Sequence, residues 1–169
     1  MSLNNMKKIE YIGKAAVIRQ HIPQTVIEFP RSMVHFHTYG MLTPFFVGLR
    51  EGRLMATRCK NPKCSEKRMW IPPRAHCPDC YELMEWEEVP QPVIGTIYAY
   101  TQVVYAGIGM ELTTPYWQID VELPDCATAP KSYLLYGTPR IGMKVKAVFR
   151  TEYPTNTVLD YCWAPYDEE

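Results

Sequence analysis

The most regular hydrophobic pattern lies in the second half of the chain, where apolar and polar positions alternate with the two-residue period of a β-strand. Five segments alternate in this way or form short apolar runs: residues 93–105, 116–123, 132–136, 144–150 and 158–163. Turns containing glycine or proline separate them, which predicts five antiparallel strands in a small Greek-key barrel of the OB type. We expect residues 93–105 to be buried on both faces and to bend at Gly95.

The beginning of the chain has shorter patterns. Residues 11–18 and 25–29 are rich in β-branched residues and are separated by a polar break, which predicts a hairpin or an extended arm rather than a helix. Such an arm would expose apolar side chains on a monomer, so we expect it to pack on the main body or on another chain.

A short helix is predicted at about residues 44–51. Thr43 is a natural N-cap, Pro44 suits the first helical position, and Gly52 would end the helix. The elements together predict three parts, which are an arm with a short helical segment, a cysteine-containing segment and the barrel: residues 1–53, 54–88 and 89–169.

Four cysteines in the middle part have the spacing of metal ligands. Cys59 and Cys64 form one close pair, Cys77 and Cys80 form the other, and twelve residues separate Cys64 from Cys77. This pattern predicts a zinc ribbon with one tetrahedral Zn²⁺. The alternatives are two disulfides or four free thiols, and His76 could replace a weak ligand. Four thiolates leave no open coordination position, so the zinc would be structural rather than catalytic.

Basic residues surround these cysteines. Residues 50–80 contain eight Lys or Arg residues against three acidic ones. Arg50, Arg53, Arg58 and Arg74 are candidates for contacts with a phosphate group or with an acidic partner surface. The alternative is that the cations only offset the net charge of −2 on a zinc ion bound by four thiolates.

Composition narrows the class of protein. The chain has 169 residues, of which 47% are hydrophobic and 21% charged, as is typical of a globular protein. Its formal net charge of zero disfavours a nucleic-acid binder, and no apolar run approaches the ~20 residues of a membrane span. Cysteines in metal-ligand spacing suit a reducing cytoplasm.

Several motifs resemble a known family. They are residues 45–55 (FFVGLREGRLM), the cysteine pairs, residues 70–77 (WIPPRAHC), and weaker matches at 95–98, 114–116, 121–123 and 141–145. Over about residues 38–166 the chain resembles a family of zinc-ribbon/OB-fold accessory subunits of thiolase-like enzymes that act on acyl-CoA. Two features depart from the family pattern: four residues separate Cys59 from Cys64, and the first 37 residues are additional.

The resemblance implies a mainly β fold, with a rubredoxin-like zinc ribbon followed by a five-stranded OB-type Greek-key barrel. It implies a non-catalytic subunit in a hetero-oligomer with a thiolase-like catalytic subunit, with two copies of each chain. The structural cofactor would be Zn²⁺, and a CoA thioester would be the substrate of the complex, with Arg50, Arg53, Arg58 and Arg74 as candidate contacts for its phosphates. The additional N-terminal residues would serve a particular partner. Apart from the resemblance, the arm and residues 33–49 carry more apolar side chains than two small cores can bury, so we expect a partner to bind there. The candidate anchors are Phe36, Tyr39, Phe45 and Phe46, and the barrel face with Tyr98 and Tyr100 is the next candidate.

Two other functions remain open. Tyr98, Tyr100 and Tyr105 could stack on nucleic-acid bases, although their segment contains no Lys or Arg to follow a phosphate backbone. The chain could also bind acyl-CoA by itself. Thiolase chemistry needs a nucleophilic cysteine, and neither Cys126 nor Cys162 has a histidine nearby in sequence, so we predict that both are ordinary thiols.

Overall fold

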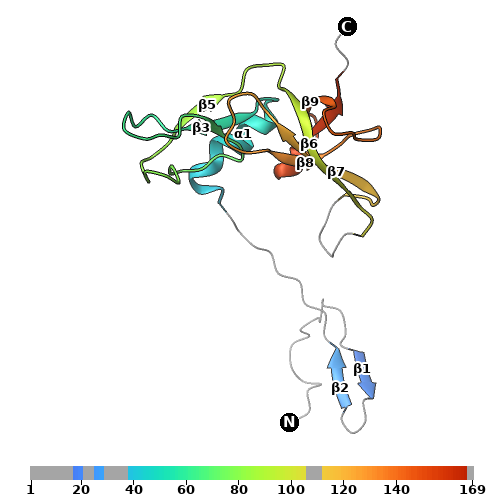
Figure 1. Cartoon of the computed structure of the whole chain (residues 1–169). Helices are drawn as coiled ribbons and strands as arrows, with labels where there is room; N and C mark the ends of the chain where they lie inside the picture. The colour runs from blue at the N-terminus through green and yellow to red at the C-terminus, as the bar shows by residue number, and fades with distance from the viewer. Residues whose placement is uncertain (1–16, 21–24, 29–37, 106–111, 167–169) are drawn as a thin grey trace, which may run out of the picture. The chain divides into compact units, whose positions relative to one another are not determined.

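The structure is a computed structural model that describes residues 17–20, 25–28, 38–105 and 112–166 (Figure 1). The chain divides into two units, Met1–His37 and Thr38–Glu169. In the first unit, β1 (Val17–Gln20) pairs with β2 (Thr25–Glu28) as an antiparallel hairpin, with Val17 opposite Glu28. The predicted hairpin is therefore confirmed over these residues, whereas the rest of the arm, with Phe36, lies outside the described residues.

The second unit begins with a short 3-10 turn, η2 (Gly40–Leu42), and a helix, α1 (Thr43–Arg50). Gly52 ends the helix as predicted, with a φ of +74° that glycine adopts without strain. The prediction of Thr43 as N-cap is wrong. Its hydroxyl donates to the carbonyl of Gly40 (2.7 Å), which places this residue inside the helix. No described helix has the length and hydropathy needed to cross a membrane.

The apolar side of α1 is part of the protein core. Phe45 and Leu49 are buried, and Gly48 lies where a Cβ atom would come within 2.5 Å of the Met55 side chain. Phe45 is therefore unavailable as an anchor for a partner, because the core already covers its ring. Phe46 is half-buried and stacks on Tyr39 with ring centroids 4.0 Å apart, so these two aromatics remain at the surface.

A three-stranded antiparallel sheet follows the helix. It consists of β3 (Met55–Arg58), β4 (Met69–Trp70) and β5 (Glu85–Glu88) in the order β4-β3-β5. The long connections between these strands carry the cysteine pairs, so this sheet and its connections form the predicted ribbon.

Five strands form the barrel: β6 (Ile94–Val103), β7 (Tyr116–Glu122), β8 (Lys131–Tyr133), β9 (Lys144–Phe149) and β10 (Tyr161–Pro165). Their order is β10-β9-β6-β7-β8, and a parallel bridge between Leu134 and Trp163 joins the two ends. The N–H of Leu135 donates to the carbonyl of Trp163 (2.7 Å) at this closure. The predicted fold class, a ribbon followed by a five-stranded OB-type barrel, is confirmed.

The last predicted strand begins three residues too early. Val158–Asp160 form a 3-10 turn, η3, because the Asp160 carboxylate organises the preceding loop. This carboxylate is 1% exposed and accepts hydrogen bonds from the N–H and hydroxyl of Thr155 (2.6 and 2.7 Å) and from the N–H of Asn156 (2.8 Å).

The prediction that residues 93–105 are buried on both faces is also wrong. The pairing of β6 with β7 shifts register between Ile97 and Ala99, and Tyr98 at the shift and Tyr100 after it are 60% and 43% exposed. Gly95 is needed for a close approach of β7 rather than for a bend. A Cβ atom there would lie 2.4 Å from a methyl group of Val121 and 2.6 Å from the carbonyl of Glu122.

The ribbon and the barrel share backbone hydrogen bonds. Met69 in β4 donates its N–H to the carbonyl of Asp125 (2.9 Å) and accepts from the N–H of Ala127 (2.8 Å), as in a parallel strand pair. The N–H of Val89 donates to the carbonyl of Leu54 (2.9 Å), which extends the pairing of β3 with β5 by one residue toward the barrel. The orientation of the ribbon on the barrel is therefore set by backbone pairing as well as by side-chain packing.

Candidate functional site

The four predicted ligands come together at one end of the ribbon. Cys59 directly follows β3 and Cys64 lies on the next turn, whereas Cys77 and Cys80 lie on the turn before β5. Their Sγ atoms all lie within 4.8 Å of one another, with separations of 3.5 Å between Cys59 and Cys80 and 3.6 Å between Cys64 and Cys77. Four sulfurs at about 2.3 Å from a tetrahedral zinc would be about 3.8 Å apart, so the cluster fits such an ion.

The disulfide alternative is not supported. All six cysteines are free thiols, and the two closest sulfur pairs are far longer than a disulfide bond of about 2.05 Å. His76 is not a member of the cluster, because its backbone instead bridges to Leu83 and its side chain is exposed. The structure therefore groups four cysteines as a candidate metal site.

Backbone donors around the cluster stabilise sulfur in its thiolate form. In three of the cysteines the sulfur accepts from the N–H two residues further on: Asn61 for Cys59, Glu66 for Cys64 and Glu82 for Cys80. The Glu82 donor lowers the pKa of Cys80 to about 7, whereas burial raises the pKa of Cys64 to about 12 and also raises that of Cys59. A metal ion would therefore bind with release of protons, as thiolate ligands require.

The four candidate arginines do not form one shared anion site. Arg50 is exposed in the last turn of α1, and Arg53 pairs with Glu51 and with Glu88 (3.1 Å). The guanidinium of Arg74 lies 5.0 Å from the centre of the Trp70 ring, a cation–π distance. Contacts of these arginines with coenzyme A or with a partner stay a prediction.

Arg58 has the most contacts of the four. It pairs with Glu87 of β5 (2.7 Å) and with Asp125 of the barrel (2.8 Å), and it donates to the carbonyl of Lys67. Its side chain is only 20% exposed, and the hydrogen bonds that it donates to Glu87 hold its pKa above the ordinary value. Arg58 directly precedes the candidate ligand Cys59, and its ion pair with Asp125 links this end of the ribbon to the barrel.

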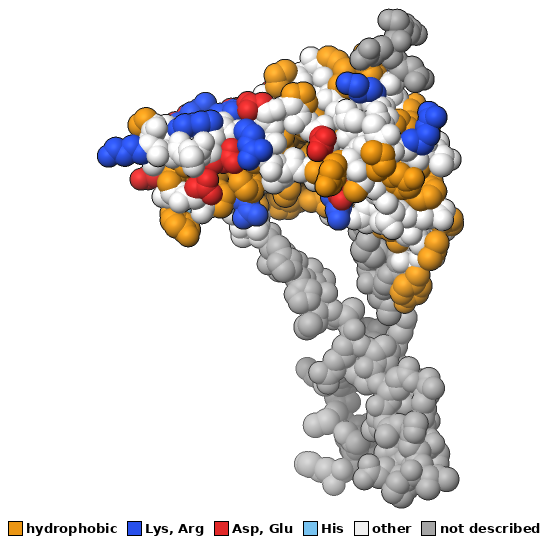
Figure 2. Space-filling model, in the orientation of Figure 1, with side chains coloured by type: hydrophobic (Ala, Val, Ile, Leu, Met, Phe, Trp, Pro, Cys, Tyr) orange, Lys and Arg blue, Asp and Glu red, His pale blue; other side chains and the backbone are white. Residues whose placement is uncertain are grey.

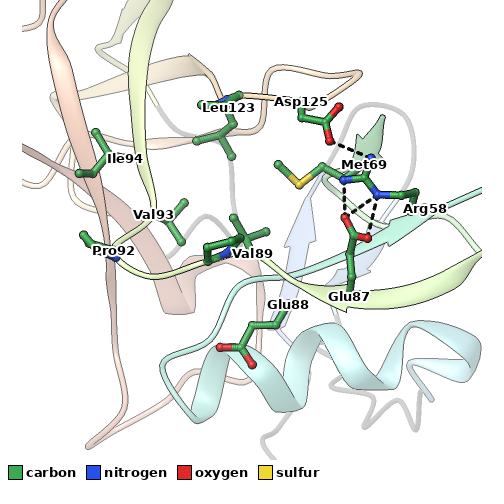
Figure 3. Close-up of a pocket in the computed structure, with 12 residues that line it drawn as sticks. Arg58, Met69, Glu87, Glu88, Val89, Pro92, Val93, Ile94, Leu123 and Asp125 are labelled. Carbon is green, nitrogen blue, oxygen red and sulfur yellow. Dashed lines mark hydrogen bonds and ion pairs between the residues drawn. The ribbon is translucent and has the colours of Figure 1, made fainter. Parts of the chain in front are cut away.

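A pocket of about 640 Å³ lies at the junction of ribbon and barrel (Figure 3). Its apolar lining comes from β4, from the segment between β5 and β6, and from the end of β7: Met69, Val89, Pro90, Pro92, Val93, Ile94, Leu123 and Pro124. Arg58, Glu87 and Asp125 form its charged wall, and Glu88 lies beside them. Sequence reasoning missed this pocket and the partners of Arg58, because the residues come from segments far apart in the chain and share no motif.

The two thiols outside the cluster, Cys126 and Cys162, have different surroundings. The Sγ of Cys126 lies 3.5 Å from the hydroxyl of Thr128, which is not a base. Cys162 is buried in β10, and burial raises its pKa, although the neighbouring Tyr133 and Arg150 act in the opposite direction. That both are ordinary thiols stays a prediction.

Comparisons with known proteins support the fold. No family model matches the chain. In the solved structures, the chain is similar to a protein of unknown function from the DUF35 family of Sulfolobus solfataricus (21% identity, TM-score 0.55, 75% of this chain and 87% of that one). It is equally similar to a chain of an Ltp2-ChsH2(DUF35) aldolase (21% identity, TM-score 0.55, 78% of this chain and 98% of that one).

A relative found by sequence gives evidence of common ancestry in addition to the shared fold. The chain is 34% identical over 100 residues to a DUF35 domain-containing scaffold protein of Methanocaldococcus jannaschii, a match that covers 57% of this chain and 67% of the relative. With this identity, the shared fold and the cluster of four cysteines, the chain belongs to the DUF35 family.

Proposed function

We propose that this protein is a non-catalytic, zinc-binding accessory subunit of a thiolase-like enzyme that acts on acyl-CoA. The observation that carries the proposal is a metal-ligand cluster built into a ribbon whose backbone is bonded to an OB barrel. Such a site can hold a surface in a defined shape but offers no open metal position for chemistry. The relatives point the same way, since one is named a scaffold protein and another is a chain of an aldolase.

Zinc is the proposed metal because four thiolates that can surround one ion tetrahedrally bind zinc in preference to Mg²⁺ or Ca²⁺. These two ions prefer oxygen ligands. The residues that would hold it are Cys59, Cys64, Cys77 and Cys80. The metal would supply folding energy to a segment with few buried residues of its own. Free thiols are also compatible with the proposed reducing cytoplasm.

The finer part of the proposal concerns the partner. Among accessory subunits of this kind, the chain is similar to the small subunit of the thiolase that cleaves benzoylsuccinyl-CoA in anaerobic toluene and benzylsuccinate degradation. We propose a complex with two copies of each chain, in which the catalytic subunit contributes the nucleophilic cysteine and this chain supports assembly and substrate handling. The three-part division at residues 53/54 and 88/89 is part of the same proposal.

Exposed aromatic residues give such a partner a surface to bind. Charged side chains of both signs are intermixed over the ribbon, whereas hydrophobic side chains gather toward the β6–β7 end of the barrel (Figure 2). Tyr98, Tyr100 and Tyr105 are exposed in this region, and Tyr100 packs edge-on against Trp117 with centroids 5.7 Å apart. Aromatic residues dominate the binding energy of protein interfaces, which supports a protein partner.

Native co-purification tests the proposal directly. The affinity-tagged full chain, expressed at its natural level, should retain a thiolase-like enzyme that mass spectrometry identifies, and the complex should turn over an acyl-CoA while this chain alone does not. The Cys126→Ser and Cys162→Ser variants should leave turnover of the complex unchanged. Recovery of nucleic acid instead of an enzyme, or turnover by this chain alone, would refute the proposal.

Removal of the additional N-terminal residues should weaken the complex. A chain that begins at Thr38 keeps the whole second unit, and therefore the cysteine cluster and the barrel. We expect it to bind about one zinc ion but to elute separately from the partner in size-exclusion chromatography at micromolar concentration. If the truncated chain co-elutes as tightly as the full chain, the arm is not the interface, and Tyr98→Ala with Tyr100→Ala becomes the next test.

A further inference from the structure

We propose that the junction pocket, lined by the twelve residues of Figure 3, is a binding site for a small uncharged molecule with an aliphatic body and a carbonyl-type acceptor. The site lies within one chain, so the proposal does not depend on the partner enzyme. Its volume of about 640 Å³ falls within the range of ligand pockets in proteins, ~300–1,000 Å³.

The apolar part of the pocket is a preformed surface. Val89, Val93, Met69 and Leu123 at its base are each less than 8% exposed and belong to the protein core. Pro90, Pro92 and Pro124 are exposed around them. Proline has a restricted backbone and no N–H group that would need a partner, so this rim presents hydrocarbon to a ligand at little cost in conformational entropy. The lining contains no aromatic side chain, which favours an aliphatic over a flat aromatic body.

The charged wall is already neutralised by its own contacts. Glu87 and Asp125 share Arg58, Lys60 lies 4.0 Å from Glu87, and Glu88 pairs with Arg53. An anionic ligand would have to displace a carboxylate from Arg58, and a cationic ligand would have to displace Arg58 itself. Loss of Glu87 or Arg58 from this pair would leave a largely buried charge without its partner, because these side chains are only 26% and 20% exposed, and that costs more than a new contact returns. The wall therefore selects an uncharged ligand.

One polar contact remains for that ligand. Within the part of the chain that the structure describes, the contacts of Arg58 with Glu87, Asp125 and the Lys67 carbonyl engage four of its five N–H groups. The N–H left over, on Nη2, can donate to one acceptor without disturbing the ion pairs. A carbonyl or amide oxygen supplies such an acceptor without adding a charge.

Three probes that share one ring and differ in charge test this inference: cyclohexanecarboxamide, cyclohexanecarboxylate and cyclohexylmethylammonium. The full-length protein is titrated with each probe, and the methyl NMR signals of Met69, Val89, Val93, Ile94 and Leu123 are followed. We expect the carboxamide to shift these signals with a Kd about tenfold lower than the Kd of either charged probe. A charged probe loses its hydration on binding and gains no unpaired opposite charge in the pocket. No shift of these signals, or equal affinity for all three probes, would overturn the proposal.

Two variants locate the site and its selectivity. Ile94→Trp should fill the pocket and abolish the carboxamide shifts, whereas Ile141→Trp, at an exposed position outside the pocket, should not. Asp125→Asn removes one carboxylate from Arg58 and should raise affinity for the carboxylate probe by several-fold relative to the carboxamide. Carboxamide binding that survives in Ile94→Trp, or an unchanged preference in Asp125→Asn, would contradict the assignment. The probe series on the unmodified protein decides the question even if one variant does not fold.

Discussion

Replacement of Cys77 by serine should remove the metal from the protein and unfold the ribbon around it. Cys77 is completely buried, its sulfur lies 3.6 Å from that of Cys64, and its replacement would leave three of the four sulfurs at the candidate site. Binding of structural zinc contributes about 10–16 kcal/mol in small zinc domains, which exceeds the whole stability of many proteins. This is therefore the largest effect that we expect from a single substitution.

The measurement is the metal content of the purified protein, together with circular dichroism as the temperature rises. The unmodified chain should contain about one zinc ion, and Cys77→Ser should contain much less and begin to unfold at a lower temperature. Cys126→Ser is the matched control, because Cys126 is a thiol outside the cluster. A full complement of zinc in Cys77→Ser, or none in the unmodified protein, would show that these cysteines are not the ligands.

The second large effect is expected at Trp163, where replacement by alanine should destabilise the barrel by about 3–5 kcal/mol. This side chain is completely buried and is the largest in the core, and its backbone forms the closure of β10 on the segment after β8. Its ring packs edge-on against that of Tyr161, with centroids 6.1 Å apart, so its removal would leave a cavity in the core that paired strands cannot collapse to fill.

Trp163→Phe separates the loss of volume from the loss of the indole N–H. In the described residues the Nε1 of Trp163 is buried without a hydrogen-bond partner, so its removal relieves a cost while most of the ring volume stays. Chemical denaturation should therefore give a loss of about 1.5 kcal/mol or less for phenylalanine. Similar losses for phenylalanine and alanine would show that the N–H, rather than packing, accounts for the effect.

The cysteine cluster could be predicted from the sequence because its spacing is local. Each pair lies on one short turn, so only the meeting of two turns had to be inferred, and the structure places all four sulfurs within 4.8 Å. The strands of the barrel were predictable for a similar reason. Alternation along β7 and β9 reports which face is buried without any knowledge of the neighbouring strand.

Features that depend on distant residues could not be predicted in this way. The apolar run at 93–105 gives no sign of the register shift beside Tyr98, which decides which tyrosines reach solvent. The start of β10 depends on the bonds from Asp160 back to Thr155 and Asn156. The basic residues were visible as a group, but only the fold shows that Arg58 is already held by Glu87 and Asp125.

The hydrogen bonds between Met69 and residues 125–127 have a consequence for protein engineering. A chimaera that received this ribbon without its barrel, or the barrel without its ribbon, would carry unpaired backbone groups where the two were separated. Each such group costs about 1–3 kcal/mol when it is buried. Ribbon and barrel should therefore be transplanted between DUF35 proteins as one cassette, with exchanges of sequence confined to the exposed turns.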